Sequence, residues 1–176
     1  MSSVWTGAQA FLARRRVTLG FVTALAAILL ARPTWTSWSV GLMVACAGEA
    51  IRIWAAGHIE KDREVTTSGP YRWMRHPLYV GSSVMALGVV IAVRSPLVAV
   101  LALLYMVTTI AAAVNTEEDR LRRAFGETYD RYARAQGPRT ARAFSVARVL
   151  RNREYRAASG VAGGFLILAL RVAFNL

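Results

Sequence analysis

The sequence predicts an all-α fold: a polytopic integral membrane bundle of about five transmembrane helices plus a cytoplasmic interfacial amphipathic helix, in a single domain over residues 1–176. Three observations lead to this prediction. Hydrophobic residues make up 55% of the chain and its mean hydropathy is +0.36. The net charge is nevertheless +12. Finally, apolar and charged residues occupy separate stretches, whereas ordinary soluble domains intermix them.

The apolar stretches define the expected transmembrane helices. They cover residues 17–35, 38–57, 77–93, 96–114 and, more weakly, 157–174. Each is close to the roughly 17 to 25 residues that cross a hydrocarbon core of about 30 Å. The alternative, buried helices of a soluble protein, would require amphipathic chain to wrap them. Too little of the 176-residue chain is left over for that.

The basic residues orient these helices, because Lys and Arg of short loops favour the cytoplasmic side. The loops carry, in order, Arg14, Arg15 and Arg16, then Arg32, then Lys61, Arg63, Arg72 and Arg75, then Arg94, then the many arginines from Arg120 to Arg156. The alternation predicts a cytoplasmic N-terminus and a C-terminus outside. It also explains the positive charge by contact with membrane lipid, so nucleic acid is not an expected partner.

The cysteine and histidine content limits the remaining classes of site. Cys46 is the only cysteine and lies within a predicted span, and His58 and His76 are the only histidines. We therefore predict neither a disulfide nor a metal site. The basic and then apolar start of the chain could be a signal peptide, but the later spans favour a retained anchor.

Charged residues also occur inside the second span. Glu49 and Arg52 are three positions apart, so they share a helix face and can form a pair. This pair has two interpretations, a functional group within the membrane or a structural clamp between helices, and the sequence leaves both open.

A polar stretch, SGPYRWMRHPLYVG, precedes the third span at residues 68–81. Gly69 and Pro70 indicate a turn, and Pro77 suits the first position of a helix. The free N–H groups and positive dipole end of that helix would lie beside Arg75 and His76, where a carboxylate or phosphate binds well. The alternative is a loop that only anchors the protein at the interface.

The stretch after the fourth span predicts the interfacial helix, over residues 115–134. An apolar stripe formed by Leu121, Phe125, Tyr129 and Tyr132 has helical spacing. We expect Thr116 to cap this helix, which would place Glu117 and Glu118 in its first turn. Two carboxylates would then stand where a span leaves the membrane, close to the cationic loop.

Together the two polar stretches resemble a known family. GPYRWMRHPLYVG followed by EEDRLRRAFGETYDRY resembles the isoprenylcysteine carboxyl methyltransferases, integral membrane enzymes related to phospholipid N-methyltransferases. The matching positions are Gly69, Pro70, Tyr71, Arg75, His76, Pro77, Tyr79 and Gly81, then Glu117, Glu118, Leu121, Phe125, Gly126, Tyr129 and Tyr132. The likeness extends from about Ile51 to Tyr132, and the upstream IRIWAAGHIEK looks like bacterial members.

The resemblance implies a methyltransferase of a bacterial inner membrane that uses S-adenosylmethionine and releases S-adenosylhomocysteine. The implied cofactor-binding residues are Tyr71, His76, Pro77, Leu78, Tyr79 and Glu117, with backbone contacts from Arg63, Glu64, Val65 and Thr66. The candidate catalytic residues are Glu117, Arg75 and Arg52. The implied acceptor is lipophilic, either a prenylcysteine-like carboxylate or a lipid amine.

Two departures from the family pattern leave the acceptor open. Prenylcysteine enzymes tend to carry an arginine shortly before the first glutamate, where this chain has AAAVN at residues 111–115. The usual VPxxIP ending is reduced to Gly137, Pro138 and Arg139 in a shifted register. Two alternatives remain: a non-catalytic membrane module, and an NADPH-dependent enzyme like the sterol reductases, which share a RxPxYxG element.

Overall fold

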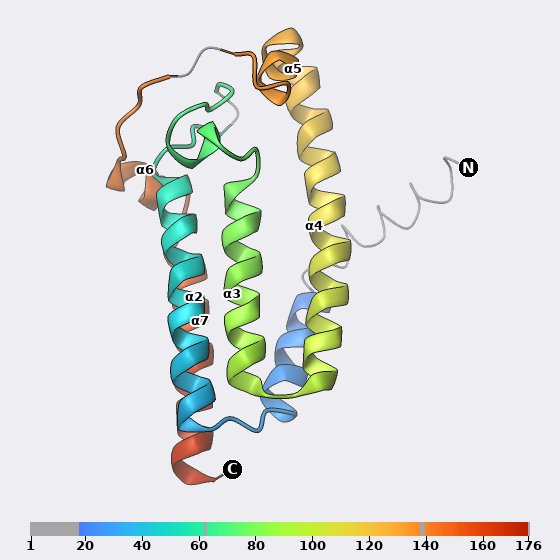
Figure 1. Cartoon of the computed structure of the whole chain (residues 1–176), viewed down its shortest axis with the longest axis vertical. Coiled ribbons are helices and arrows are strands. Elements are labelled where there is room, and N and C mark those ends of the chain that lie inside the picture. The colour runs from blue at the N-terminus through green and yellow to red at the C-terminus, as the bar shows by residue number, and fades with distance from the viewer. Residues whose placement is uncertain (1–17, 62, 138–139, 176) are drawn as a thin grey trace, which may run out of the picture.

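The computed structural model describes residues 18–61, 63–137 and 140–175, and this part of the chain consists of helices and loops without a strand. Its helices are Thr18–Leu29, α2 (Trp35–Ala56), the 3-10 turn η1 (Gly69–Arg72), α3 (Pro77–Val93), α4 (Pro96–Phe125), α5 (Glu127–Ala133), α6 (Val146–Arg151) and α7 (Tyr155–Phe174). Helices α2, α3 and α4 stand side by side and α7 packs against α2 (Figure 1).

The bundle has two distinct ends. The long loops over residues 57–76 and 140–145 gather with α5 and α6 at one end, which we call the loop end (Figure 1). The short connections at residues 30–34 and 94–95 lie with the C-terminus at the opposite end, the far end. Polar segments that are distant in sequence therefore meet at the loop end, where a site can form.

The predicted all-α membrane fold is confirmed, and an apolar helix lies in each of the five predicted segments, although they differ in length. Three helices, α2, α4 and α7, are long and apolar enough to cross a membrane. Thr18–Leu29 and α3 are apolar but shorter. Pro77 starts α3 and the left-handed Arg94 (φ 53°) ends it, which limits it to about 25 Å at 1.5 Å per residue. Arg14, Arg15, Arg16, Pro138 and Arg139 lie outside the described residues.

Helices α2 and α3 pack backbone against backbone. A Cβ atom added at Gly88 would lie 2.5 Å from the Ala45 nitrogen and 2.5 Å from the Gly41 carbonyl oxygen. Gly48 and Gly81 are in equally close contact nearer the loop end. Small residues at such a crossing are typical of membrane helix pairs, in which dispersion contacts replace the hydrophobic effect. This crossing fixes α3, and with it the start of α3, relative to α2.

Gly88→Ala is expected to lower the stability of the protein, because the neighbouring atoms are backbone and cannot rotate away. Overpacking of this kind costs about 1–3 kcal/mol, which corresponds to a fall of roughly 2–12 °C in the midpoint of thermal unfolding for a chain of this size. The measurement is thermal unfolding in detergent. Gly163→Ala in α7 is the matched control, because no atom lies within 4 Å of the added methyl group. Equal midpoints for the two variants would contradict the packing.

Helix α4 is continuous from Pro96 to Phe125, so the predicted separate helix beginning at residue 115 is wrong. The Thr116 hydroxyl donates a hydrogen bond to the Ala112 carbonyl (2.8 Å) within the helix and does not cap an N-terminus. Nothing between residues 114 and 125 breaks a helix, and the break comes only at Gly126, whose φ of 49° suits glycine. Glu117 and Glu118 therefore lie on the same rigid helix as the membrane-spanning leucines.

The surroundings of α4 divide along its length. Near its start the large apolar side chains are exposed, as expected for a lipid-facing helix: Leu97, Val100, Leu103, Leu104 and Val107. Near its end, α5 folds back onto the loop that precedes α3. Tyr129 of α5 is buried, and the Tyr132 hydroxyl donates to the Tyr71 carbonyl (3.0 Å). The end of α4 and the 68–76 loop are thereby held together.

Candidate functional site

A cavity of about 790 Å³ lies at the loop end, within the size range of small-molecule sites. We call it the polar cavity. It is bordered by α2, the loop before α3, the start of α3, the middle of α4 and the segment that joins α6 to α7. Eight residues predicted for the site border it: Arg52, Tyr71, Arg75, His76, Pro77, Leu78, Tyr79 and Glu117.

Three of the four predicted backbone contributors lie beside this cavity. Glu64, Val65 and Thr66 border a neighbouring cavity of about 40 Å³, which shares Tyr71 and Glu117 with the polar cavity. Arg63 is exposed and borders neither of these two cavities. The structure thus brings residues 64–66 next to the main group of candidate residues and leaves Arg63 outside it.

His76 lies between the two adjacent carboxylates of α4. Its Nε2 is 3.1 Å from Glu118 Oε1, and its Nδ1 is 3.9 Å from Glu117 Oε2. Arg75 Nη1 donates to the same Glu118 oxygen at 3.0 Å. Glu118 therefore ties the start of α3 to α4, a role that the sequence did not reveal. The Glu117 side chain is 28% exposed, and Glu117 borders the polar cavity.

The start of α3 is less open than expected. Pro77 begins the helix as predicted. However, proline has no N–H, and the Tyr79 N–H bonds to the His76 carbonyl at 3.1 Å. Within the first turn only the Leu78 N–H remains for a ligand. The helix dipole still favours an anion here, although the N–H groups contribute less than the sequence suggested.

Tyr71 carries a buried hydroxyl with no hydrogen-bond partner in the described part of the chain. Its side chain is held in η1 and is only 6% exposed. Burial and, to a smaller extent, the Glu117 carboxylate raise the pKa of Tyr71, so the phenol keeps its proton. An unpaired buried hydroxyl costs about 1–3 kcal/mol. Because Tyr71 borders the polar cavity, a polar ligand group there would satisfy it.

The turn before Tyr71 depends on His58. Gly69 has φ of 57°, and a Cβ atom there would lie 2.5 Å from the His58 ring. The ring Nδ1 is 3.2 Å from Ser68 Oγ, which fixes its orientation. Burial, followed by the charges of Arg148, Arg142 and Arg72, lowers the pKa of His58. A neutral imidazole packed against glycine is a structural support for the loop.

Arg52 forms a stronger ion pair than the predicted one. Glu49 is 3.8 Å away, whereas Arg52 Nε donates to Glu154 Oε1 at 2.6 Å. Arg52 Nη1 also donates to the Ser82 hydroxyl. Glu154 lies among the many arginines between Arg120 and Arg156, a stretch for which the sequence indicates only a role in membrane orientation. Its one distinguishing feature in the sequence is that no other acidic residue follows Asp130.

Basic side chains outnumber acidic ones around the polar cavity. The basic residues are Arg52, Lys61, Arg75, Arg120, Arg153 and Arg156, and the acidic residues are Glu117 and Glu154. Within the described ranges, no three His, Cys, Asp or Glu side chains are grouped to hold a metal ion. The site is thus best suited to a ligand with anionic groups and at least one cationic group.

Comparison with known proteins places these features in a family. The family model described as phospholipid methyltransferase matches residues 21–128. A probable protein-S-isoprenylcysteine O-methyltransferase of Oryza sativa subsp. indica is 33% identical over 111 residues, covering 56% of this chain and 58% of the relative. The protein-S-isoprenylcysteine O-methyltransferase of Schizosaccharomyces pombe is 31% identical over 86 residues, covering 49% and 36%.

A third relative carries a different name. The nickel-cobalt-cadmium resistance protein NccN of Alcaligenes xylosoxydans xylosoxydans is 31% identical over 138 residues, covering 72% of this chain and 64% of the relative. No solved structure matches the chain. The chain thus spans a little over half the length of the rice relative.

The predicted kinship with the isoprenylcysteine carboxyl methyltransferases is confirmed by these relatives. The family match includes the whole 68–81 stretch and Glu117 and Glu118, the residues that meet around His76. Since that match covers more than half of the sequence, the chain belongs to the phospholipid methyltransferase family.

Proposed function

We propose that the protein transfers a methyl group from S-adenosylmethionine to a lipophilic acceptor at the cytoplasmic membrane face. The observation that carries this proposal is the polar cavity, which unites Tyr71 and His76 of one motif with Glu117 of the other. The family and the methyltransferase relatives support methyl transfer. We assign the loop end to the cytoplasm because its loops carry most of the basic residues.

The residues around the polar cavity fit the groups of this cofactor. Its carboxylate matches Arg75 and the dipole at the start of α3, and its ammonium matches Glu117. The rings of His76 and Tyr79, with centroids 5.7 Å apart, offer flat surfaces to an adenine. The Tyr71 hydroxyl supplies the remaining polar contact.

The cofactor supplies an electrophilic methyl group, so the protein needs no covalent intermediate. The chain has to bind both partners, orient the acceptor in line with the methyl group and exclude water. A carboxylate acceptor needs no base for this step. The buried Tyr71 and the connected His76–Glu118 pair give the site the rigidity that such alignment requires.

The acceptor is proposed to enter from the lipid. Glu117 follows the start of α4 by 21 positions, which is roughly 32 Å along the helix. That length is close to the thickness of the hydrocarbon core, about 30 Å. Small residues of α4, Ala112 and Ala113, line the cavity on the membrane side of Glu117. The cavity therefore extends from the headgroup level into the depth where an apolar tail lies.

Of the two arginines among the candidate catalytic residues, Arg75 is the freer to bind a ligand. Arg52 is held by Glu154 and Ser82, so its hydrogen-bonding capacity is largely used inside the protein. Arg75 makes one ion pair to Glu118, and its side chain is about half exposed. We propose that Arg75 orients an anionic part of a ligand and that Arg52 is structural.

Calorimetry of the purified protein with S-adenosylhomocysteine tests the cofactor site. We expect saturable binding, followed in an activity assay by transfer of labelled methyl groups into a lipid extract. Failure of the parent protein to bind would refute the proposal and favour a non-catalytic module. Binding of NADPH in its place would favour the reductase alternative.

Tyr71→Phe is expected to weaken adenosylhomocysteine binding by about 2- to 12-fold, the contribution of one hydrogen bond. The unfolding midpoint without ligand should not fall, because the hydroxyl has no partner in the described protein. Calorimetry and thermal unfolding measure the two effects. Tyr155→Phe, at an exposed position on α7, is the control and should change neither. Unchanged affinity of Tyr71→Phe would remove Tyr71 from the site.

A further inference from the structure

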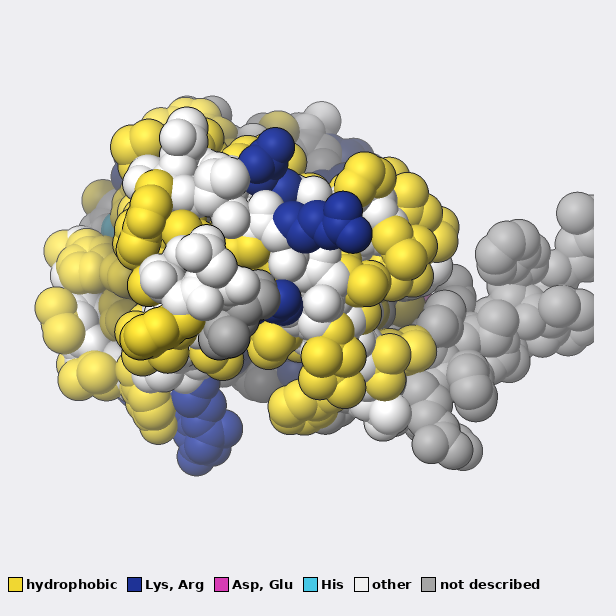
Figure 2. Space-filling model, turned by 90° about the horizontal axis from the view of Figure 1, so that it is seen from below, with side chains coloured by type: hydrophobic (Ala, Val, Ile, Leu, Met, Phe, Trp, Pro, Cys, Tyr) yellow, Lys and Arg dark blue, Asp and Glu magenta, His cyan; other side chains and the backbone are white. Residues whose placement is uncertain are grey.

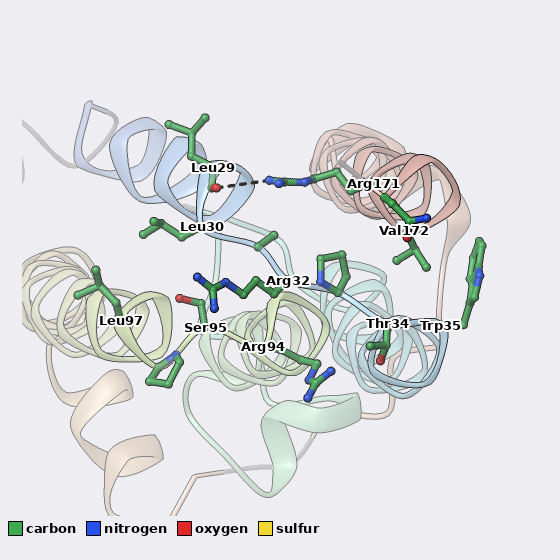
Figure 3. Close-up of a pocket in the computed structure, with 14 residues that line it drawn as sticks. Leu29, Leu30, Arg32, Thr34, Trp35, Arg94, Ser95, Leu97, Arg171 and Val172 are labelled. Atoms are coloured by element: carbon green, nitrogen blue, oxygen red, sulfur yellow. Dashed lines mark hydrogen bonds between the residues drawn. The ribbon is translucent and has the colours of Figure 1, made fainter.

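A second and larger cavity, of about 1120 Å³, lies at the far end of the bundle. It is bordered by the end of the Thr18–Leu29 helix, the start of α2, the turn between α3 and α4, and the end of α7. Arg32 comes from the 30–34 connection, Arg94 from the turn between α3 and α4, and Arg171 from the end of α7 (Figure 3). Nothing in the proposed methyl transfer uses this group of arginines.

The arginine charges are not balanced by acidic side chains. The sequence contains no Asp or Glu before Glu49, between Glu64 and Glu117, or after Glu154. None of the residues bordering the far-end cavity is acidic. Figure 2 shows this end with basic side chains framed by hydrophobic ones, and no described acidic side chain is visible on that face. An anion from outside the chain would provide the missing negative charge.

The three arginines differ in their present partners. Arg171 Nη1 donates to the carbonyls of Ile28 and Leu29, which fixes its guanidinium at the cavity. The side chains of Arg32 and Arg94 are exposed and form no ion pair or hydrogen bond within the described residues. The guanidinium of Arg171 is thus held in place before a ligand binds, whereas the side chains of Arg32 and Arg94 can reorient to contact a ligand.

Two helix starts add to the positive potential. Thr34 caps α2 and Ser95 caps α4, and both caps border the cavity. Neither helix has an acidic residue in its first turn. The positive ends of a 22-residue and a 30-residue helix therefore point toward the same space as the arginines.

Apolar side chains flank the arginines. Leu29, Trp35 and Leu97 border the cavity and are more than half exposed. Helix α2 borders this cavity at Trp35 and the polar cavity at Arg52, 17 positions apart, which is about 26 Å along the helix. The far-end cavity therefore lies at the opposite boundary of a bilayer core of about 30 Å. A ligand in this cavity would contact the charged arginines at the level of the lipid headgroups and the apolar side chains next to the hydrocarbon core.

We propose that the far-end cavity binds a phosphate group carried by an anionic lipid of the leaflet opposite the polar cavity. Guanidinium groups bind phosphate oxygens in bidentate fashion, and the apolar flank matches acyl chains. A water-soluble phosphate shares the charged part of this chemistry but gains nothing from Leu29, Trp35 and Leu97. The site is distinct from the proposed acceptor site at the loop end.

The test compares short-chain phosphatidylglycerol, short-chain phosphatidylcholine and inorganic phosphate as ligands of the full chain in detergent, with binding followed by native mass spectrometry and by thermal stabilisation. We expect saturable binding of phosphatidylglycerol only. The double variant Arg32→Gln, Arg94→Gln should bind it about tenfold more weakly or worse. Arg123→Gln, at an exposed position near the other end of α4, removes one arginine charge away from the cavity and is the control for Arg32→Gln alone; it should bind like the parent.

Equal binding of the two lipids, or equal affinity of the double variant and the parent, would overturn the proposal. Inorganic phosphate binding as strongly as the lipid would overturn the lipid assignment. If the double variant fails to fold, Arg32→Gln alone should show a smaller loss of affinity, and an unchanged affinity would count against the site. Adenosylhomocysteine binding is measured in parallel, so failure here and failure of the methyltransferase proposal are distinguishable.

Discussion

Replacement of Glu117 by glutamine is expected to weaken adenosylhomocysteine binding by about 30-fold or more, because the ligand ammonium would enter a basic cavity without its carboxylate partner. Removing one partner of a desolvated charge pair costs about 2–5 kcal/mol. The other carboxylate that borders the polar cavity, that of Glu154, is already paired with Arg52, and six basic side chains border the cavity as well. No second carboxylate is therefore available to the ligand ammonium. Calorimetry of the purified variant measures the loss.

Two neighbouring positions provide controls for this result. Asp119→Asn removes the same charge from a side chain that is 66% exposed and does not border the cavity, so affinity should stay close to that of the parent. Glu118→Gln acts on His76 and Arg75 indirectly, and we expect an intermediate loss. If Glu118→Gln binds adenosylhomocysteine more weakly than Glu117→Gln does, then Glu118, and not Glu117, is the carboxylate that pairs with the ligand ammonium.

Glu154→Ala is expected to destabilise the protein by about 3–5 kcal/mol, because it leaves Arg52 charged and largely buried without its main partner. For a chain of this length the unfolding midpoint should fall by roughly 6–20 °C. The pair also joins α2 to the start of α7, so its loss removes a contact between these two helices. Thermal unfolding in detergent measures it.

The matched control removes a glutamate from an exposed ion pair. Glu127 and Arg131 are 2.7 Å apart on α5, yet both side chains are more than half exposed. Glu127→Ala should therefore cost only about 0.3–0.5 kcal/mol. The double variant Arg52→Met, Glu154→Leu should recover much of the stability lost in Glu154→Ala. Equal effects of Glu154→Ala and Glu127→Ala would show that burial does not strengthen the Arg52 pair.

Local signals predicted most of the fold. The start of α3 at Pro77 and the turn at Gly69 follow from the backbone limits of proline and glycine, which neighbouring residues hardly alter. The predicted break between the fourth span and the amphipathic stretch is wrong, because a change from apolar to polar residues does not by itself end a helix. Helix α4 continues through Asn115 and Thr116 since neither residue interrupts backbone hydrogen bonding.

Long-range partners were the part that the sequence could not supply. Glu154 lies 102 positions from Arg52, and no spacing rule connects them. The pairing of His76 and Arg75 with Glu118, in preference to Glu117, depends on the rotation of α4 about its axis. Motif spacing placed all these residues at the same end of the bundle, but tertiary packing decided which carboxylate faces the cavity.

The unbroken α4 has a consequence for how the site responds to its membrane. The opposite wall of the polar cavity, at the start of α3, is fixed to α2 through glycine contacts, whereas α4 packs much less against α3. Helices adjust to bilayer thickness by tilting. Because no joint separates the lipid-facing leucines from this end of α4, a tilt of α4 is expected to strain the Glu118 contacts that hold it to His76 and Arg75. One wall of the polar cavity is thus fixed to α2 and the other belongs to a lipid-facing helix, so we expect ligand affinity at this cavity to vary with bilayer thickness.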